Sequence, residues 1–212
     1  MTRTTLILVR HGQTDHNLSG RYQGQSDVPM NALGREQIEA VARELAGVPA
    51  AAIYSSDLMR SRESALIIGR ALGLEPVIAQ ELRERSFGSF EGLTHEEAAA
   101  RFPQSWAQRE RDSEAWIPPG GESLGELWER VLRFAETLWR RHDAKVFVVA
   151  AHGGPMKAIL CDALGAPAAT RGRFPISNGS ISVITRAAAG PVMLLLDDTC
   201  HLGRLPDDVQ AD

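Results

Sequence analysis

Two short apolar runs in this sequence each end abruptly at a histidine and a glycine. The first, Leu6 to Val9, is followed by Arg10 and His11, and the second, residues 146–151, is followed by His152. A continuous apolar run of this length is typical of a strand buried on both faces of a parallel sheet. The carboxyl ends of such strands line the ligand crevice of an open α/β sheet. We therefore expect His11 and His152 to lie together at that edge.

The other apolar positions recur at helical spacing or in short strand-like runs. Helices are predicted at residues 33–45, 57–72, 123–141 and 153–164, further strands at 51–54 and 77–78, and a closing antiparallel pair at 181–185 and 192–196. Thr94 and Ser123 each begin a capping-box pattern, and residues 55–57 are expected to cap the helix that follows them. This alternation predicts an α/β fold, a three-layer α/β/α sandwich with a mostly parallel central sheet.

Residues 104–121 interrupt this alternation. They contain two tryptophans, two adjacent prolines and two adjacent glycines, a mixture that favours irregular structure over a helix or a strand. We expect this segment to form a lid or a wall of the site. Residues 1–212 are otherwise expected to form a single domain, with a frayed polar tail at 206–212.

Composition narrows the classes of protein to which the chain can belong. Apolar residues make up 43% and charged residues 24% of 212 residues, which is typical of a folded globular protein. The net charge of −4 without a basic run argues against nucleic-acid binding. The first apolar run is too short for a signal peptide or a membrane span, and the two cysteines are expected to stay reduced in the cytoplasm. The quaternary state stays open, a homodimer included.

The residues at the predicted sheet edge suit a bound phosphate. The glycines after His152 begin a helix whose free amide groups attract an anion. Arg10 ends the first strand, and Arg60 lies in the first turn of the helix after the second strand. Guanidinium groups match phosphate oxygens through forked hydrogen bonds. No set of residues has the spacing of a metal site, so we expect no metal and no cofactor.

Five motifs in this chain resemble the signature of the histidine phosphatase superfamily, the phosphoglycerate-mutase-like proteins. They are Leu8-Val9-Arg10-His11-Gly12-Gln13-Thr14 with Asn17, Ser55-Ser56-Asp57-Leu58-x-Arg60, Leu82-x-Glu84-x-x-Phe87-Gly88-x-Phe90-Glu91-Gly92, Gly120-Gly121-Glu122-Ser123 and Ala151-His152-Gly153-Gly154. The resemblance spans roughly residues 5–186 and follows the order of the family's motifs. It implies a phosphoglycerate-mutase-like fold and a metal-independent phosphatase that acts on small phosphomonoesters.

The resemblance also implies a role for each of these residues. His11 would accept the phosphoryl group as a phosphohistidine, and Glu84 would serve as general acid and base. Arg10, Arg60 and His152 would hold the phosphate oxygens, while Asn17, Gln23, Gly24 and Gly153 would complete the substrate-binding set. The other four histidines, His16, His95, His142 and His201, are expected at the surface.

Two alternative functions stay open at this point. A phosphoglycerate mutase of this family would carry a Tyr and a Lys after the acid, where this chain has Phe87 and His95. A non-catalytic phosphate-binding module would have no need of both histidines and Glu84. Both observations favour a phosphatase. Arg85, Arg109 and Arg111 are candidates for recognising a second anionic group, and Trp106 and Trp116 are candidates for stacking on a ring.

Overall fold

The computed structural model describes residues 3–203, so the tail expected at 206–212 lies outside the described residues. At its centre is a six-stranded sheet in the order β3-β2-β4-β1-β5-β6. The strands are β1 (Thr4–Arg10), β2 (Ala50–Ser55), β3 (Val77–Ile78), β4 (Val146–Ala151), β5 (Ile181–Ala187) and β6 (Gly190–Asp198). The first four are parallel, whereas β5 and β6 form the predicted antiparallel pair. The sheet is therefore mostly parallel, as the sequence predicts.

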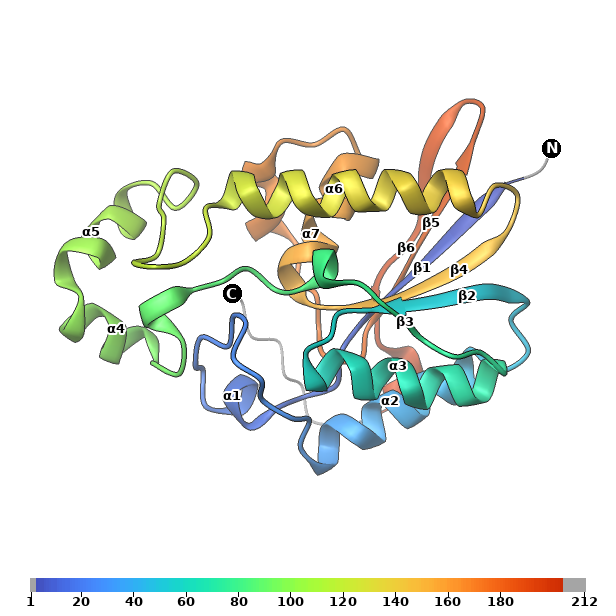
Figure 1. Cartoon of the computed structure of the whole chain (residues 1–212), viewed down its shortest axis with the longest axis horizontal. Helices are drawn as coiled ribbons and strands as arrows, with labels where there is room; N and C mark the ends of the chain where they lie inside the picture. The colour runs from blue at the N-terminus through green and yellow to red at the C-terminus, as the bar shows by residue number, and fades with distance from the viewer. Residues whose placement is uncertain (1–2, 204–212) are drawn as a thin grey trace.

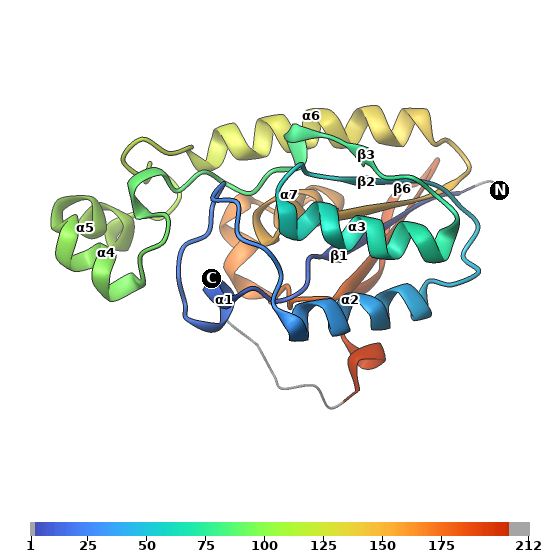
Figure 2. The ribbon, with the colours of Figure 1, turned by 60° about the horizontal axis from the view of Figure 1, so that its bottom comes forward.

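Helices cover both faces of this sheet (Figure 1; Figure 2). One face carries α2 (Ala32–Glu44) and α3 (Met59–Leu72), and the other carries α6 (Leu124–Arg141) and α7 (Gly153–Ala163). Successive residues of β1 alternate between the two layers, because Leu6 and Leu8 pack with α6 and α7 while Ile7 and Val9 pack with α2 and α3. The three-layer sandwich expected from the sequence is confirmed.

Two of the three predicted helix caps are present in the structure, and the third is not. Thr94 and Ser123 both form the predicted capping boxes. The prediction that residues 55–57 cap α3 is wrong, because Asp57 instead pairs with Arg83 at 2.5 Å. The first amide of α3, at Met59, donates to Asp27 Oδ1 at 2.7 Å. A carboxylate distant in sequence thus caps α3, and local pattern alone does not reveal it.

The short α1 (Asp15–Leu18), α4 (His95–Arg101) and α5 (Pro103–Arg111) lie toward the carboxyl ends of the parallel strands (Figure 1). The prediction that residues 104–121 are irregular is wrong for the part that forms α5. None of the residues of α5 is buried, so the helix has no apolar stripe that the sequence pattern could reveal. Short 3₁₀ helices occur at Gln80–Leu82, Gly88–Phe90, Ala168–Arg173 and Cys200–Leu202.

His142 corrects the expectation of a surface histidine. Its side chain is buried at the end of α6, where Nε2 lies 2.8 Å from the Tyr54 hydroxyl and the ring stacks 5.0 Å from Phe147. It therefore joins α6 to the sheet. Within residues 3–203, no helix has the length and apolar character needed to cross a membrane.

Candidate active site

The two histidines that follow β1 and β4 lie side by side. These strands are parallel neighbours, and their last residues, Arg10 and Ala151, lie opposite each other. Both strands therefore end at the same edge of the sheet. The His11 and His152 ring centroids are 5.1 Å apart, with the ring planes tilted by 60°. The pairing of the strands therefore brings together two residues that are far apart in sequence.

His11 is a neutral imidazole with one defined tautomer. Its Nδ1 lies 2.8 Å from the Gly12 carbonyl oxygen. A carbonyl oxygen only accepts hydrogen bonds, so Nδ1 carries the proton and Nε2 carries the lone pair. Burial, with help from the charges of Arg60 and Arg10, lowers the pKa of His11 well below its ordinary value. Nε2 is therefore a free base at neutral pH.

His152 is fully buried next to His11. Burial and the charge of Arg60 lower its pKa well below the ordinary value, so it is also neutral. Its Nε2 lies 2.7 Å from the Ser56 hydroxyl, and its Nδ1 has no hydrogen-bond partner in the part of the chain that the structure describes. If the Ser56 hydroxyl donates to Nε2, Nδ1 carries a proton that can be offered to a bound anion.

Arg10 and Arg60 lie near the histidine pair with part of their donor capacity already in use. Arg60 donates to the carbonyl oxygens of Gly24 and Ser26 at 2.7 and 2.8 Å, and Arg10 donates to that of Ile176. The Nε atoms of both arginines are buried and have no hydrogen-bond partner among residues 3–203. Although burial lowers the pKa of Arg60 to about 10, its guanidinium group remains charged near neutral pH. Buried donors without partners carry a free-energy cost that a bound anion would remove.

Three of the four expected substrate-binding residues line the same cleft. Asn17 Oδ1 accepts from the Thr14 amide at 3.1 Å, and Gln23 Oε1 accepts from the Thr14 hydroxyl at 2.9 Å. Both side chains therefore keep their NH₂ groups as donors. Gly24 also lines the cleft, but Gly153 does not, and the next residue, Gly154, takes its place there.

Glu84 is held in the cleft by two backbone amides. Its Oε1 accepts from the Arg85 amide at 2.7 Å, and its Oε2 accepts from the Gly154 amide at 3.1 Å. A Cβ at Gly154 would lie only 2.2 Å from Glu84 Oε1. Glycine is therefore the residue that allows the carboxylate to approach the N-terminus of α7 so closely.

Two further residues support this geometry, and only the first of them, Glu91, belongs to a sequence motif. Glu91 accepts from the Gln25 amide at 3.0 Å and the Ser26 hydroxyl at 2.7 Å, which fixes the loop that Arg60 contacts. Asn178 donates to the His11 carbonyl oxygen at 3.0 Å. The only local signal for Asn178 is the Asn-Gly turn dipeptide before β5, and its partner is distant in sequence.

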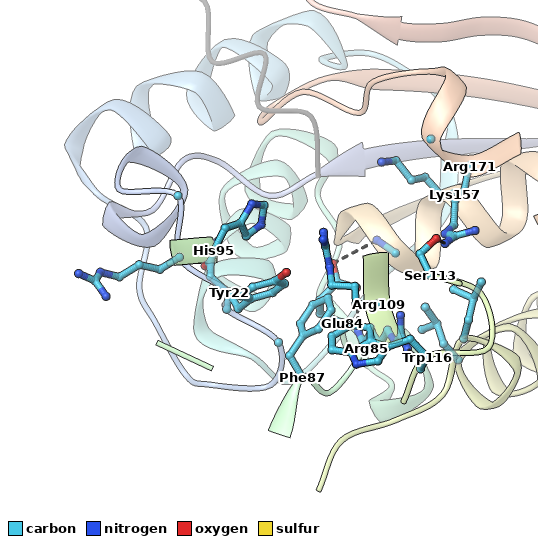
Figure 3. Close-up of a pocket in the computed structure, with 18 of the residues that line it drawn as sticks. Tyr22, Glu84, Arg85, Phe87, His95, Arg109, Ser113, Trp116, Lys157 and Arg171 are labelled. Atoms are coloured by element: carbon cyan, nitrogen blue, oxygen red, sulfur yellow. Dashed lines mark hydrogen bonds between the residues drawn. The ribbon is translucent and has the colours of Figure 1, made fainter. Parts of the chain in front are cut away.

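The complete cleft encloses about 780 Å³ and extends outward past Glu84. Figure 3 shows unlike surfaces on the two sides of that carboxylate. We call Tyr22, Phe87 and His95 the aromatic wall, and Lys157 and Arg171 the cationic wall. Trp116 and Arg109 from the 104–121 segment also line the cleft, whereas Trp106 and Arg111 do not. The described residues contain no group of three or more His, Cys, Asp or Glu side chains that could hold a metal ion.

Comparison with known proteins identifies the family. A sequence profile of the histidine phosphatase superfamily (branch 1) matches residues 6–199. The chain belongs to the histidine phosphatase superfamily. This histidine phosphatase is 35% identical to phosphoserine phosphatase 1 of Hydrogenobacter thermophilus over 198 residues, which cover 93% of this chain and 94% of the relative.

Another relative and a solved structure are also similar to this chain. The metal-independent phosphoserine phosphatase of Arabidopsis thaliana is 34% identical over 186 residues, or 85% of this histidine phosphatase and 76% of the relative. The structure of mycobacterial glucosyl-3-phosphoglycerate phosphatase superposes with a TM-score of 0.82 at 28% identity, covering 92% of this chain and 99% of the other. The resemblance stated from the five motifs is therefore confirmed, and the named relatives belong to the enzyme class expected from the sequence.

Proposed function

We propose that this chain is a metal-independent phosphatase that hydrolyses small phosphomonoesters through a phosphohistidine at Nε2 of His11. The observation that carries the proposal is the combination of a neutral His11 whose Nε2 bears the lone pair with buried donors that lack partners beside it. A neutral imidazole is a good nucleophile, and a dianionic phosphate is the ligand that such donors stabilise.

The first step transfers the phosphoryl group to the enzyme. His11 Nε2 attacks phosphorus while the bond from phosphorus to the ester oxygen breaks. The protonated carboxyl of Glu84 gives its proton to the departing alkoxide, so the product leaves as an alcohol. Nδ1 of His11 keeps its proton on the Gly12 carbonyl oxygen throughout.

The second step returns the enzyme to its starting state. Water attacks phosphorus, the Glu84 carboxylate takes one of its protons, and the bond from phosphorus to Nε2 breaks. Inorganic phosphate leaves, and Glu84 is protonated again. Because the proton on Glu84 is spent in the first step and recovered in the second, the cycle needs no external acid.

The charge that develops on the phosphate oxygens is balanced by groups already in place. Nε of Arg10, Nε of Arg60 and Nδ1 of His152 are buried donors that would bind these oxygens. Ser56 is a positioning residue in this proposal: its hydroxyl donates to His152 Nε2, which keeps the proton on Nδ1 toward the phosphate.

The proposed substrates are small phosphorylated metabolites, as the names of the relatives suggest. These relatives are a phosphoserine phosphatase, a metal-independent phosphoserine phosphatase and a glucosyl-3-phosphoglycerate phosphatase. We also propose that the chain forms one domain and acts in the cytoplasm. The aromatic wall has Phe87 and His95 in place of the Tyr and Lys of a mutase, which favours hydrolysis over isomerisation.

Turnover of p-nitrophenyl phosphate in the presence of EDTA tests this proposal. We expect release of p-nitrophenol and inorganic phosphate that EDTA leaves unchanged and that His11→Ala abolishes. No turnover at any pH between about 5 and 8 would favour the non-catalytic module. Phosphoglycerate isomerisation faster than phosphate release, dependent on added bisphosphoglycerate, would favour the mutase.

A further inference from the structure

Arg130 binds the backbone of the segment that carries Glu84. This arginine lies on α6, where its Nη1 donates to the Glu81 carbonyl oxygen at 2.7 Å and its Nη2 donates to that of Glu84 at 3.0 Å. Residues 83–87 form neither a helix nor a strand. The position of this segment therefore depends on contacts from other elements, and Arg130 supplies two of them.

The guanidinium group of Arg130 is itself fixed by the carboxylate of Glu122. Its Nε and Nη2 donate to the two carboxylate oxygens at 2.7 and 2.9 Å, which is the forked arrangement that an arginine and a carboxylate favour. The two side chains are only 22% and 15% exposed, so solvent and salt screen the pair weakly. Glu122 also accepts from the Ser86 amide at 3.3 Å. One guanidinium group and its carboxylate partner thus hold residues 81–86 beside α6.

The carboxylate of Glu84 and its backbone are held by two helices that pack together. Leu127, one helical turn before Arg130, is buried in the core that α6 and α7 share. A Cβ at Gly154 would lie 3.1 Å from Leu127 Cδ2, so the start of α7 lies directly against this turn of α6. The Gly154 amide binds the carboxylate of Glu84, and Arg130 binds its carbonyl oxygen. Packed helices therefore fix both ends of this residue.

Arg130 acts on the site through these hydrogen bonds more than through its charge. The described residues that line the cleft do not include Arg130, so it is not placed to touch a substrate there. Burial is the main cause that lowers the pKa of His152, and the charge of Arg130 is the smallest of the contributing causes. By contrast, Arg130 contacts the backbone of Glu84 directly.

We propose that Arg130 is a positioning residue for the general acid. By holding the carbonyl oxygen of Glu84, it keeps the carboxylate within reach of the departing ester oxygen. Gln25 Nε2 also donates to this carbonyl oxygen, at 3.2 Å, so loss of the Arg130 contacts should displace Glu84 rather than release it. This inference rests on the phosphatase function proposed above. It predicts a defect confined to proton transfer, because the donors that would hold the phosphate belong to other elements.

Arg130→Lys tests the proposal, because lysine keeps the positive charge but loses the fork of donors. We expect kcat/KM for phosphoserine to fall at least about tenfold, since misplacement by about 1 Å can cost about 100-fold in rate. The kcat/KM for p-nitrophenyl phosphate, whose leaving group scarcely needs a proton, should fall less than about threefold. The calorimetric Kd of inorganic phosphate should stay within about twofold of the wild-type value, because the phosphate-binding groups do not move.

Arg133→Lys is the matched control for this test. Arg133 lies on the same helix and also pairs with a glutamate, Glu129, but its side chain is 74% exposed. This variant should keep the wild-type kcat/KM for both substrates and the wild-type Kd of phosphate. Equal losses of kcat/KM for the two substrates in Arg130→Lys, no loss for either, or phosphate binding weakened at least about tenfold would overturn the proposal.

The backbone amide of Gly154 provides a test that is independent of turnover. It donates to the carboxylate of Glu84, so its ¹⁵N chemical shift reports where that carboxylate lies. We expect the shift to move in Arg130→Lys toward its value in Glu84→Ala and to stay unchanged in Arg133→Lys. If no substrate is turned over, the phosphatase proposal fails, but the Gly154 shift still decides whether Arg130 positions Glu84. Movement in Arg130→Lys would support that role, and an unchanged shift would reject it.

Discussion

Replacing Gly154 by alanine should displace the proposed general acid while leaving the helix intact. A Cβ at this position would lie 2.2 Å from Glu84 Oε1 and 3.1 Å from Leu127 Cδ2. The carboxylate has the freedom to move, whereas the backbone of α7 is fixed by the sheet beneath it. Alanine suits a helix better than glycine does, so the fold should tolerate the change.

The magnitude follows from the size of the overlap. Oε1 must retreat by roughly 1 Å to reach a tolerable carbon–oxygen contact. This movement shifts the whole carboxylate, so it also weakens the 3.1 Å hydrogen bond that Oε2 accepts from the Gly154 amide. A displacement of about 1 Å in a catalytic group can cost about 100-fold in rate. We therefore expect kcat/KM for phosphoserine to fall about 100-fold in Gly154→Ala.

The choice of leaving group identifies the cause of the loss. The alkoxide of phosphoserine needs a proton as it departs, whereas p-nitrophenolate scarcely does. The kcat/KM for p-nitrophenyl phosphate should therefore fall less than about tenfold in Gly154→Ala. Glu84→Gln should show the same selective loss. Gly125 is also the second residue of a helix, but a Cβ there meets no atom closer than 3.9 Å. The kcat/KM values of Gly125→Ala should therefore stay near those of the wild type. Equal losses of kcat/KM for both substrates in Gly154→Ala would contradict a displaced general acid.

The remaining predictions concern the two buried histidines. Ser56→Ala should lower kcat/KM by about tenfold, because His152 loses the hydroxyl that fixes its tautomer, and ¹⁵N NMR should show a changed proton distribution on that ring. His11→Gln should make unfolding less sensitive to acid. The pKa of folded His11 lies well below that of the unfolded chain, so protons favour unfolding as the pH falls below about 6.5. Chemical denaturation at pH 7 and pH 5 should show up to about 2 kcal/mol less loss of stability in the variant.

Each of these predictions has a result that would contradict it. Ser55 is buried beside Ser56, and its hydroxyl has no partner among the described residues, which makes Ser55→Ala the matched control. An equal loss of activity in Ser55→Ala, or unchanged ¹⁵N shifts of His152 in Ser56→Ala, would remove the positioning role of Ser56. Parallel pH dependences of stability in wild type and His11→Gln would contradict a neutral, buried His11.

The sequence was most informative where chemistry and secondary structure share one local pattern. The apolar runs before His11 and His152 indicated buried parallel strands, and the structure pairs these strands directly. Because ligands bind at the carboxyl ends of such strands, the sequence also predicted that the two histidines lie together. Arg60 could be placed in the same way, because it follows β2 in the first turn of α3.

Features that depend on tertiary contacts could not be read from the sequence. The cap of α3 comes from Asp27, and the contact of Ser56 with His152 crosses 96 positions of the chain. Lys157 and Arg171 belong to no motif, and only the packing of α7 beside the 168–173 turn places both on the cleft. The helix α5 was missed for a different reason, because it buries no residue and thus has no apolar periodicity.

The most direct test of the account is to trap and locate the phosphoryl group on the protein. Wild-type enzyme quenched during turnover of a ³²P-labelled substrate should carry label that is labile in acid and stable in base, as expected for a phosphohistidine. Peptide mapping should place this label on His11, and His11→Ala should carry none. Label that persists in His11→Ala, or that maps to another residue of the wild type, would contradict the assignment of His11 as the nucleophile.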